Sequence, residues 1–176
     1  MNIVSPLHTA PSPSCTPEEF KEGMRHLIGG VTIICTRHEG KSYGMTATAV
    51  CSVAAEPPLL LVCLNEKGVT GNAVVKSGVF SVNLIEKQQQ ELARRFSQHV
   101  YEGDRFDHGA WEPGVGGVPV LVDSPASFEC RLIHKMKAGS HYVIIGQVEK
   151  VSTCSTLDPL GYVKGEFGSL KRMGSL

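Results

Sequence analysis

The sequence predicts a mainly β protein, a closed antiparallel barrel with a few helices. Strand-like segments outnumber helical ones, and turn signals recur about every 8–12 residues. The apolar run over residues 59–64 has the length of a buried strand, and the stretch just before it, residues 44–48, is small and hydroxyl-rich. The length of 176 residues with 41% hydrophobic content fits a single domain with a real core.

A capped helix opens this domain. Thr16 and Glu19 match a capping box, and Phe20, Met24 and Leu27 recur on one helical face before two glycines end the helix. The preceding segment contains several Pro and Ser but neither a basic start nor an apolar core, so it is not a signal peptide. We therefore divide the chain into a flexible arm, residues 1–15, and one domain, residues 16–176.

The remaining elements follow from periodicity and turn residues. A second helix is predicted over residues 70–76 with Thr70 as its cap, and a third over residues 88–96. In the third helix Leu92, Ala93 and Phe96 face inward, while Arg94 and Arg95 face solvent. Turns are expected over residues 38–41, 52–58 and 135–140, and a long irregular stretch over residues 99–119. Strands are expected over residues 31–36, 43–48, 59–64, 79–84, 118–122, 126–133, 142–151 and 160–167.

Charge and cysteine content exclude several functions. Lys plus Arg and Asp plus Glu both number 17, so the net charge of zero indicates no nucleic-acid or anionic-membrane partner. The longest apolar run is too short to span a bilayer. The six cysteines contain no Cys-x-x-Cys pair, and four of them lie in apolar strand-like runs, where a thiol acts as a small hydrophobe. These features favour a reducing, cytoplasmic setting without a disulfide framework or a metal site.

Two stretches could bind a ligand. The small strand over residues 44–48 would let a flat ligand approach the backbone, and its N–H and hydroxyl groups could contact polar edges. A helix that begins at Thr70 would offer backbone amides to a phosphate. The same residues also fit an ordinary pair of barrel strands and a connector helix that is capped for stability alone.

The order of several motifs resembles the short-chain flavin reductases of two-component flavin-dependent monooxygenases, such as the reductase component of 4-hydroxyphenylacetate 3-monooxygenase. The most specific motif is Gly-Met-Thr-Ala-Thr-Ala-Val-Cys-Ser-Val at residues 44–53. Supporting motifs are Glu-Pro-Pro-Leu (56–59), Val-Cys-Leu-Asn (62–65), Gly-Val-Phe-Ser-Val-Asn (78–83), Phe-Glu-Cys (128–130), Gly-Ser-His (139–141) and Ile-Gly-Gln-Val (145–148).

The resemblance implies an FMN-binding split barrel, a homodimer that reduces FMN or FAD with NADH or NADPH and supplies reduced flavin to a partner oxygenase. It also implies roles for nine residues. Those expected along the flavin ring and ribityl chain are Met45, Thr46, Ala47 and Thr48; those at the polar edge of the ring, through main-chain groups, are Ser52 and Val53; those near the phosphate are Asn65 and Thr70; and the catalytic residue on the nicotinamide side is His141.

One departure and two alternatives stand beside this interpretation. Relatives often have Gly-Asp-His where this chain has Ser140, which keeps a hydrogen-bonding group but removes the charge. A non-catalytic flavin-binding protein could use the same barrel. An enzyme similar to pyridoxamine-phosphate oxidase is disfavoured, because no basic cluster for a second phosphorylated substrate is evident in the sequence.

Overall fold

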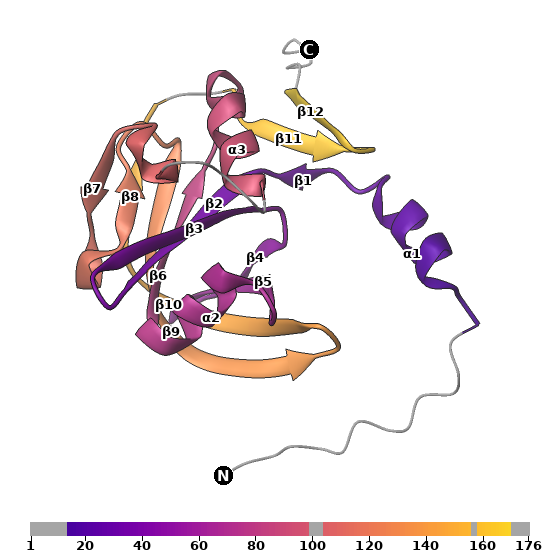
Figure 1. The fold of residues 1–176 in the computed structure, drawn as a ribbon, viewed down its shortest axis with the longest axis horizontal. Coiled ribbons are helices and arrows are strands. Elements are labelled where there is room, and N and C mark those ends of the chain that lie inside the picture. Colours follow the sequence, from indigo (N-terminus) through magenta and orange to yellow (C-terminus); the bar gives the residue numbers. More distant parts are fainter. Residues whose placement is uncertain (1–13, 99–103, 156–157, 170–176) are drawn as a thin grey trace.

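A seven-stranded antiparallel sheet forms the body of the computed structural model, which describes residues 14–98, 104–155 and 158–169 (Figure 1). Its strand order is β3-β2-β6-β9-β10-β5-β4, and every neighbouring pair is antiparallel. The strands are β2 (Thr32–His38), β3 (Lys41–Ala47), β4 (Val50–Ala55), β5 (Pro58–Asn65), β6 (Val79–Leu84), β9 (Ala126–Ala138) and β10 (His141–Thr153). Predominantly β content with few helices is thus confirmed.

The two edge strands of this sheet are consecutive in the chain. Only Thr48 and Ala49 lie between β3 and β4, although five other strands separate them in the sheet. The sheet therefore has to curl round on itself, in keeping with the natural twist and coiling of large sheets. No ladder of hydrogen bonds joins β3 to β4 in the described residues. The predicted closed barrel is wrong in this respect.

Helix α3 (Gln90–Ser97) packs against β3 on one face of the sheet. The Thr46 hydroxyl donates a hydrogen bond of 2.6 Å to the Ala93 carbonyl of α3. A Cβ on Gly44 would lie 2.5 Å from the Phe96 ring, so the glycine allows the helix to approach the strand closely. Phe96 in turn packs edge-on against Phe106, with 5.2 Å between ring centroids. These contacts hold the helix over the face of β3, and the outer edge of β3 has no strand partner among the described residues.

Smaller elements surround the main sheet. One small sheet joins β1 (Gly29–Gly30), β11 (Leu160–Val163) and β12 (Glu166–Ser169), and another pairs β7 (Trp111–Pro113) with β8 (Pro119–Leu121). The other helices are α1 (Pro17–Met24), α2 (Val69–Ser77) and the 3₁₀ turns η1 (Lys87–Gln89), η2 (Arg105–Asp107) and η3 (Val115–Gly117).

The core has two main parts, one on each face of the sheet. Beneath α2, residues such as Ile34, Val74 and Phe80 are fully buried, and beneath α3, residues such as Ile33 and Phe96 are buried with Leu92 and Ala93. The prediction for the inward face of α3 is confirmed. Burial of such side chains supplies about 1.5–3 kcal/mol each, which makes them the main source of stability.

A buried asparagine connects four strands. Asn83 of β6 donates from Nδ2 to the Ile33 carbonyl of β2 at 3.1 Å. Its Oδ1 accepts hydrogen bonds from the Leu121 amide of β8 at 3.0 Å and from the Ser127 hydroxyl of β9 at 2.9 Å. Because a buried amide is costly unless it is satisfied, these bonds fix the positions of the strands around it.

Several sequence predictions agree closely with the structure. The capping box at Thr16 and Glu19 is present, and β6 spans the predicted residues 79–84. Cys35 and Cys130 are buried as expected, and burial raises the pKa of the Cys130 thiol to about 12. The predicted arm, residues 1–15, lies almost entirely outside the described residues, as does the start of the predicted loop at residues 99–103.

Other predictions were wrong about where strands begin and end. Most of the turn predicted over residues 52–58 is strand: residues 52–55 belong to edge strand β4, because its pairing with β5 continues up to the pair Ala55 and Pro58. Strand β9 runs through residues 135–138, which pair with β10, so the turn shrinks to Gly139 and Ser140. The final segment is a hairpin of β11 and β12, with Lys164 and Gly165 both at positive φ, as a tight two-residue turn requires.

The cysteine prediction held only in part. Cys51 is exposed on β4 and Cys63 is half-buried on β5, so neither behaves as a fully buried hydrophobe. The alternation of β5 explains Cys63, since its neighbours Val62 and Leu64 are the residues that point into the core.

Candidate functional site

Two adjoining cavities flank β3. The first, which we call the α2 cavity, has a volume of about 520 Å³ and lies between β3, the start of α2 and the η2 region. The second, the hairpin cavity, has a volume of about 810 Å³ and lies between β3, α3 and the β11–β12 hairpin. Residues that line both cavities are Met45, Thr46, Asn65 and Ser97. The two cavities therefore adjoin, and β3 is a wall of both.

The shared wall consists of residues that the sequence singled out. Met45, Thr46 and Ala47 are half-buried on β3, and Thr48 is exposed just beyond its end. All four line the hairpin cavity. The hydroxyl of Thr46 is committed to α3, as described above, so its remaining contribution to the wall is its methyl group and backbone. Thr48 is held against Gly29, where an added Cβ would lie 2.8 Å from the Thr48 Cβ.

The first turn of α2 faces the α2 cavity. The helix begins after Gly68, whose carbonyl accepts the first helical hydrogen bond from the Asn72 amide at 3.1 Å. The amides of Val69, Thr70 and Gly71 therefore precede the intrahelical ladder, as at any helix start. Thr70 is buried inside this turn, so the prediction that it caps the helix was wrong. Gly68 fits the cap position because it adopts the required extended backbone without needing a side chain.

Asn65 shapes the turn that leads into α2. Its carbonyl accepts a hydrogen bond from the Gly68 amide at 3.0 Å, and its Oδ1 accepts one from the Lys67 amide at 2.8 Å. A Cβ on Gly71 would lie 2.8 Å from the Asn65 carbonyl oxygen, so the turn folds tightly onto the helix. This arrangement leaves Asn65 at the junction of the two cavities.

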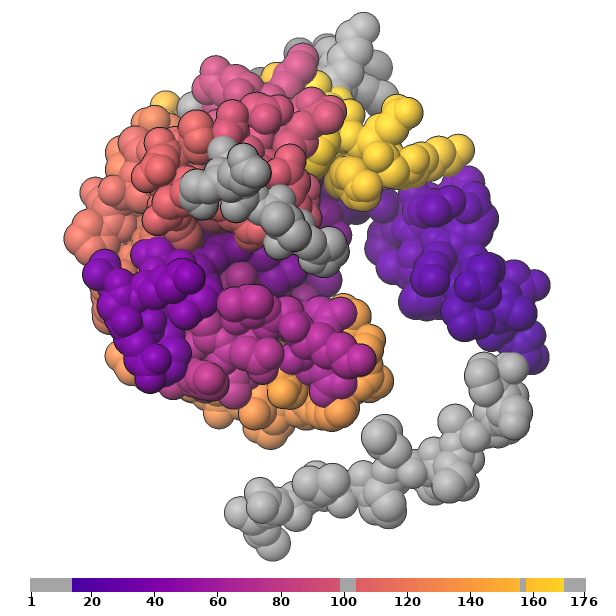
Figure 2. All heavy atoms as spheres, viewed as in Figure 1, coloured from indigo at the N-terminus to yellow at the C-terminus, as the bar shows by residue number. Residues whose placement is uncertain are grey.

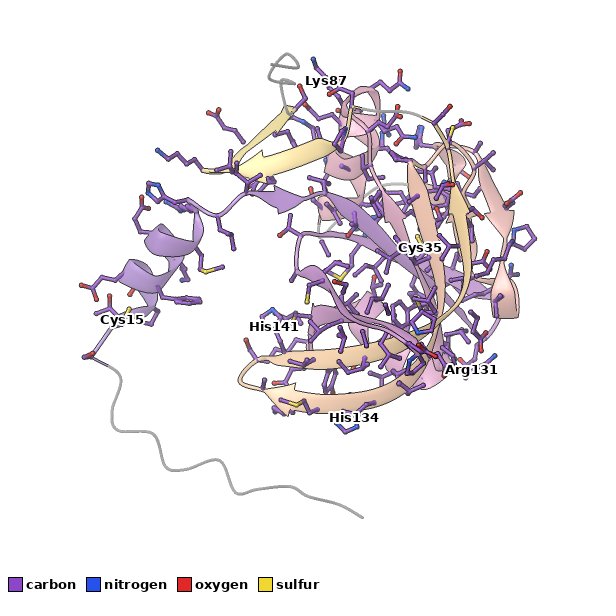
Figure 3. The ribbon with its side chains drawn as sticks, turned by 180° about the vertical axis from the view of Figure 1, so that it is seen from behind. Cys15, Cys35, Lys87, Arg131, His134 and His141 are labelled. Atoms are coloured by element: carbon purple, nitrogen blue, oxygen red, sulfur yellow. The ribbon has the colours of Figure 1, made fainter. Side chains whose placement is uncertain are left out.

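His141 lies opposite Asn65, because the pairing of β10 with β5 places these two residues in register. It lines the hairpin cavity at the start of β10, where Figure 3 labels it. Its Nδ1 is 3.0 Å from the Ser140 hydroxyl, and the Ser140 carbonyl accepts a hydrogen bond from the Glu66 amide. Ser140 therefore fixes one ring nitrogen of His141, and the other nitrogen remains for a ligand.

Two of the predicted site residues lie apart from the rest. Ser52 and Val53 are exposed on β4, at an irregularity in its pairing with β5, and line neither cavity. The other seven, namely Met45, Thr46, Ala47, Thr48, Asn65, Thr70 and His141, all line one or both cavities.

The structure adds residues that sequence reasoning did not place in the site. The hairpin cavity is also lined by Arg94 of α3 and by Tyr162 and Phe167 of the β11–β12 hairpin. The two-residue turn Lys164-Gly165 was the available signal for that hairpin. The basic residues that line the α2 cavity are Lys41, Lys67 and Arg105.

A half-buried thiol, Cys63, also lines the hairpin cavity. Burial raises the pKa of the Cys63 thiol, and the neighbouring Cys51 adds to the rise. Because the thiolate is the nucleophilic form, Cys63 remains a neutral wall residue near pH 7. Nor does the described part of the chain group three or more His, Cys, Asp or Glu residues in a way that could hold a metal ion.

Comparisons with known proteins identify the family. The model of the flavin reductase like domain matches residues 24–171. The chain belongs to the flavin reductase like family. FMN reductase (NADH) RutF of Ancylobacter novellus is 35% identical over 139 residues, which cover 79% of this chain and 77% of that relative.

Solved structures of flavin reductases agree with this assignment. Nitrilotriacetate monooxygenase component B from Mycobacterium thermoresistibile superposes with a TM-score of 0.83 at 29% identity. The superposition covers 88% of this chain and 86% of the chain of that protein. Flavin reductase PheA2 superposes with a TM-score of 0.81 at 29% identity, and the superposition covers 90% of this chain and the whole PheA2 chain. Among the described residues of this flavin reductase-like chain, no helix is long and apolar enough to cross a bilayer.

The residues of the site fit the flavin that this family name implies. The α2 cavity offers helix-start amides and the exposed Lys67 to a phosphate. The shared wall offers small and flexible side chains to a flat ring.

The first test addresses the wall. We expect Thr48→Leu to weaken flavin binding by about 1–3 kcal/mol, because the larger side chain extends into the hairpin cavity and the hydroxyl is lost. Titration by quenching of flavin fluorescence measures the effect. The matched control is Thr153→Leu, an exposed position of β10 that lines neither cavity. Equal flavin affinity in Thr48→Leu and the parent protein would remove Thr48 from the site.

Proposed function

We propose that this protein is an NADH-dependent flavin reductase with FMN as its flavin. The observation that carries the proposal is the pair of cavities that share β3 as a wall, one lined by the first turn of α2 and the other by His141. Such a site can hold a flavin and a nicotinamide side by side. The choice of FMN and NADH is supported by the name of the relatives, FMN reductase (NADH).

The flavin would lie along the shared wall. We place its ring and ribityl chain against Met45, Thr46, Ala47 and Thr48, and its phosphate at the first-turn amides of α2, near Asn65 and Thr70. The exposed ammonium group of Lys67 lies in the same cavity and would add to the attraction. Contacts with the main chain at Ser52 and Val53 require the polar edge of the ring to reach beyond Ala49 along β4.

The protein contributes binding and orientation rather than covalent chemistry. A bound flavin supplies the hydride acceptor, and the nicotinamide supplies the hydride. His141 would orient the nicotinamide through the ring nitrogen that Ser140 leaves available. A serine at this position provides no charge to hold the imidazole as a cation, so we assign His141 to positioning rather than charge stabilisation.

The test of this function is NADH oxidation in the presence of free flavin. We expect steady turnover with FMN, followed at the NADH absorbance, with the same assay repeated for FAD and for NADPH. A protein that binds FMN but leaves NADH unoxidised would be a flavin-binding protein instead. Oxidation of a phosphorylated pyridoxine substrate without NADH would point to the pyridoxamine-phosphate oxidase alternative.

A second prediction concerns His141. We expect His141→Ala to raise KM for NADH more than it lowers kcat and to leave flavin affinity almost unchanged, since the residue lies on the nicotinamide side. The reverse pattern, a large fall in kcat with little change in KM, would assign it a charge-stabilising role. If kcat/KM for NADH matches the parent, His141 is a structural turn residue.

Reduced flavin would pass to a partner enzyme. Nitrilotriacetate monooxygenase component B is by its name one component of a monooxygenase, which supports a partner oxygenase for this chain as well. The six free cysteines are in keeping with the reducing environment of the cytoplasm, where we propose that both proteins work.

We also propose that the protein is a homodimer in which α1 packs on a second copy. No residue of α1 is buried, and Phe20 and Met24 are 62% and 47% exposed; Leu27 and Ile28, just after the helix, are 65% and 60% exposed. Figures 1 and 2 show α1 projecting from the body next to β12. An apolar helix face that its own chain leaves in water needs a partner surface.

Light scattering tests the dimer. We expect a mass about twice the 18.9 kDa of one chain. Phe20→Glu should shift the protein towards the monomer, because it places a charge in the proposed interface. Lys21→Glu, on an exposed position of the same helix, is the control. A monomeric parent at micromolar concentration with full activity would refute the dimer.

A further inference from the structure

Arg94 is an arginine of α3 that lines the hairpin cavity, where the sequence predicted a solvated side chain. It is the one arginine or lysine among the described residues of that lining. Its guanidinium lies over the Phe167 ring of β12, 5.5 Å from the ring centroid. The aromatic ring thus holds the cation at the cavity wall and leaves the guanidinium N–H groups available for an anion.

The neighbouring arginine is arranged differently. Arg95 pairs with Glu91 at 3.7 Å and lies 2.9 Å from a ring nitrogen of His108, and it lines neither cavity. Within the described part of the chain, no carboxylate forms an ion pair with Arg94. Arg95 therefore interacts with side chains of its own fold, whereas Arg94 is exposed at the hairpin cavity.

The distribution of cations over the two cavities indicates what Arg94 would bind. Lys41, Lys67 and the first turn of α2 lie in the α2 cavity, where we place the flavin phosphate. The hairpin cavity holds His141 at one wall and Arg94 with two aromatic residues at another. A nicotinamide dinucleotide carries flat rings on either side of a pyrophosphate, and a guanidinium is the side chain best matched to phosphate oxygens.

We propose that Arg94 binds the pyrophosphate of the nicotinamide dinucleotide and so positions the hydride donor in the hairpin cavity. This proposal rests on the proposed reductase function. Glu166 lines the same cavity and opposes anions there. Arg94 gives the pyrophosphate of NADH one cationic partner, and the described lining offers no second arginine or lysine to the additional phosphate of NADPH.

The test compares a donor with and without phosphates. Arg94→Ala should raise KM for NADH about tenfold, the loss of one charge-assisted hydrogen-bonding partner, with flavin affinity unchanged. Arg94→Lys should restore part of the affinity, and Arg95→Ala should leave KM unchanged. With N-benzyl-1,4-dihydronicotinamide, which has no pyrophosphate, Arg94→Ala and the parent should have equal KM values.

A binding measurement separates this proposal from the reductase function. Calorimetry with NAD⁺ should show a weaker Kd for Arg94→Ala by about the same factor, whether or not turnover occurs. If Arg94→Ala raised KM by the same factor for NADH and for N-benzyl-1,4-dihydronicotinamide, Arg94 would only support the hairpin through Phe167. Weaker binding of flavin by Arg94→Ala would assign Arg94 to the flavin site instead. Either result, or an unchanged Kd for NAD⁺, would overturn the proposal. Failure of the parent to oxidise NADH would refute the function but not the binding role.

Discussion

The connection of two residues between β3 and β4 is the constraint on which the rest of the structure depends. These strands occupy opposite edges of a seven-stranded sheet, so Thr48 and Ala49 can join them only if the sheet curls through most of a turn. β5 and β10 are paired neighbours in the sheet, and the curl brings the end of β3 next to them. Met45, Asn65 and His141 meet there, although they come from distant parts of the sequence.

The candidate binding site lies beside β3, which is an edge strand of the curled sheet. Helix α3 packs over the face of β3 next to this edge, held by the hydrogen bond from Thr46 and by the close approach of Phe96 to Gly44. The same helix then carries Arg94 to the hairpin cavity. Packing in the core and presentation of polar groups at the site thus depend on one short helix, whose inner face is buried and whose outer face is basic.

Sequence patterns correctly predicted features that depend on residues close together in the chain. The capping box of α1, the bounds of β6 and the small residues of β3 are each set by neighbours in the chain. Seven of the nine residues that the resemblance to flavin reductases singles out line the two cavities, and their contact with flavin or nicotinamide stays a prediction. Long-range pairing decided the rest. Residues 50–55 became a strand because β5 was available beside them, and Arg94 entered the site because the β11–β12 hairpin folds next to α3. The turn at Lys164-Gly165 signals the hairpin itself, but its packing beside α3 and the pairing of β4 with β5 depend on segments that are distant or not recognisable as partners in a single sequence.

Hydrogen–deuterium exchange with and without FMN tests most directly whether flavin binds at the opening beside β3. The free edge of β3 and the first-turn amides of α2 have no ladder partners of their own, so a ligand that covers them should slow their exchange. We expect protection of residues 44–49 and 69–71, with β7 and β8 unchanged as an internal reference. Protection confined to other strands, with residues 44–49 unaffected at saturating FMN, would contradict the account.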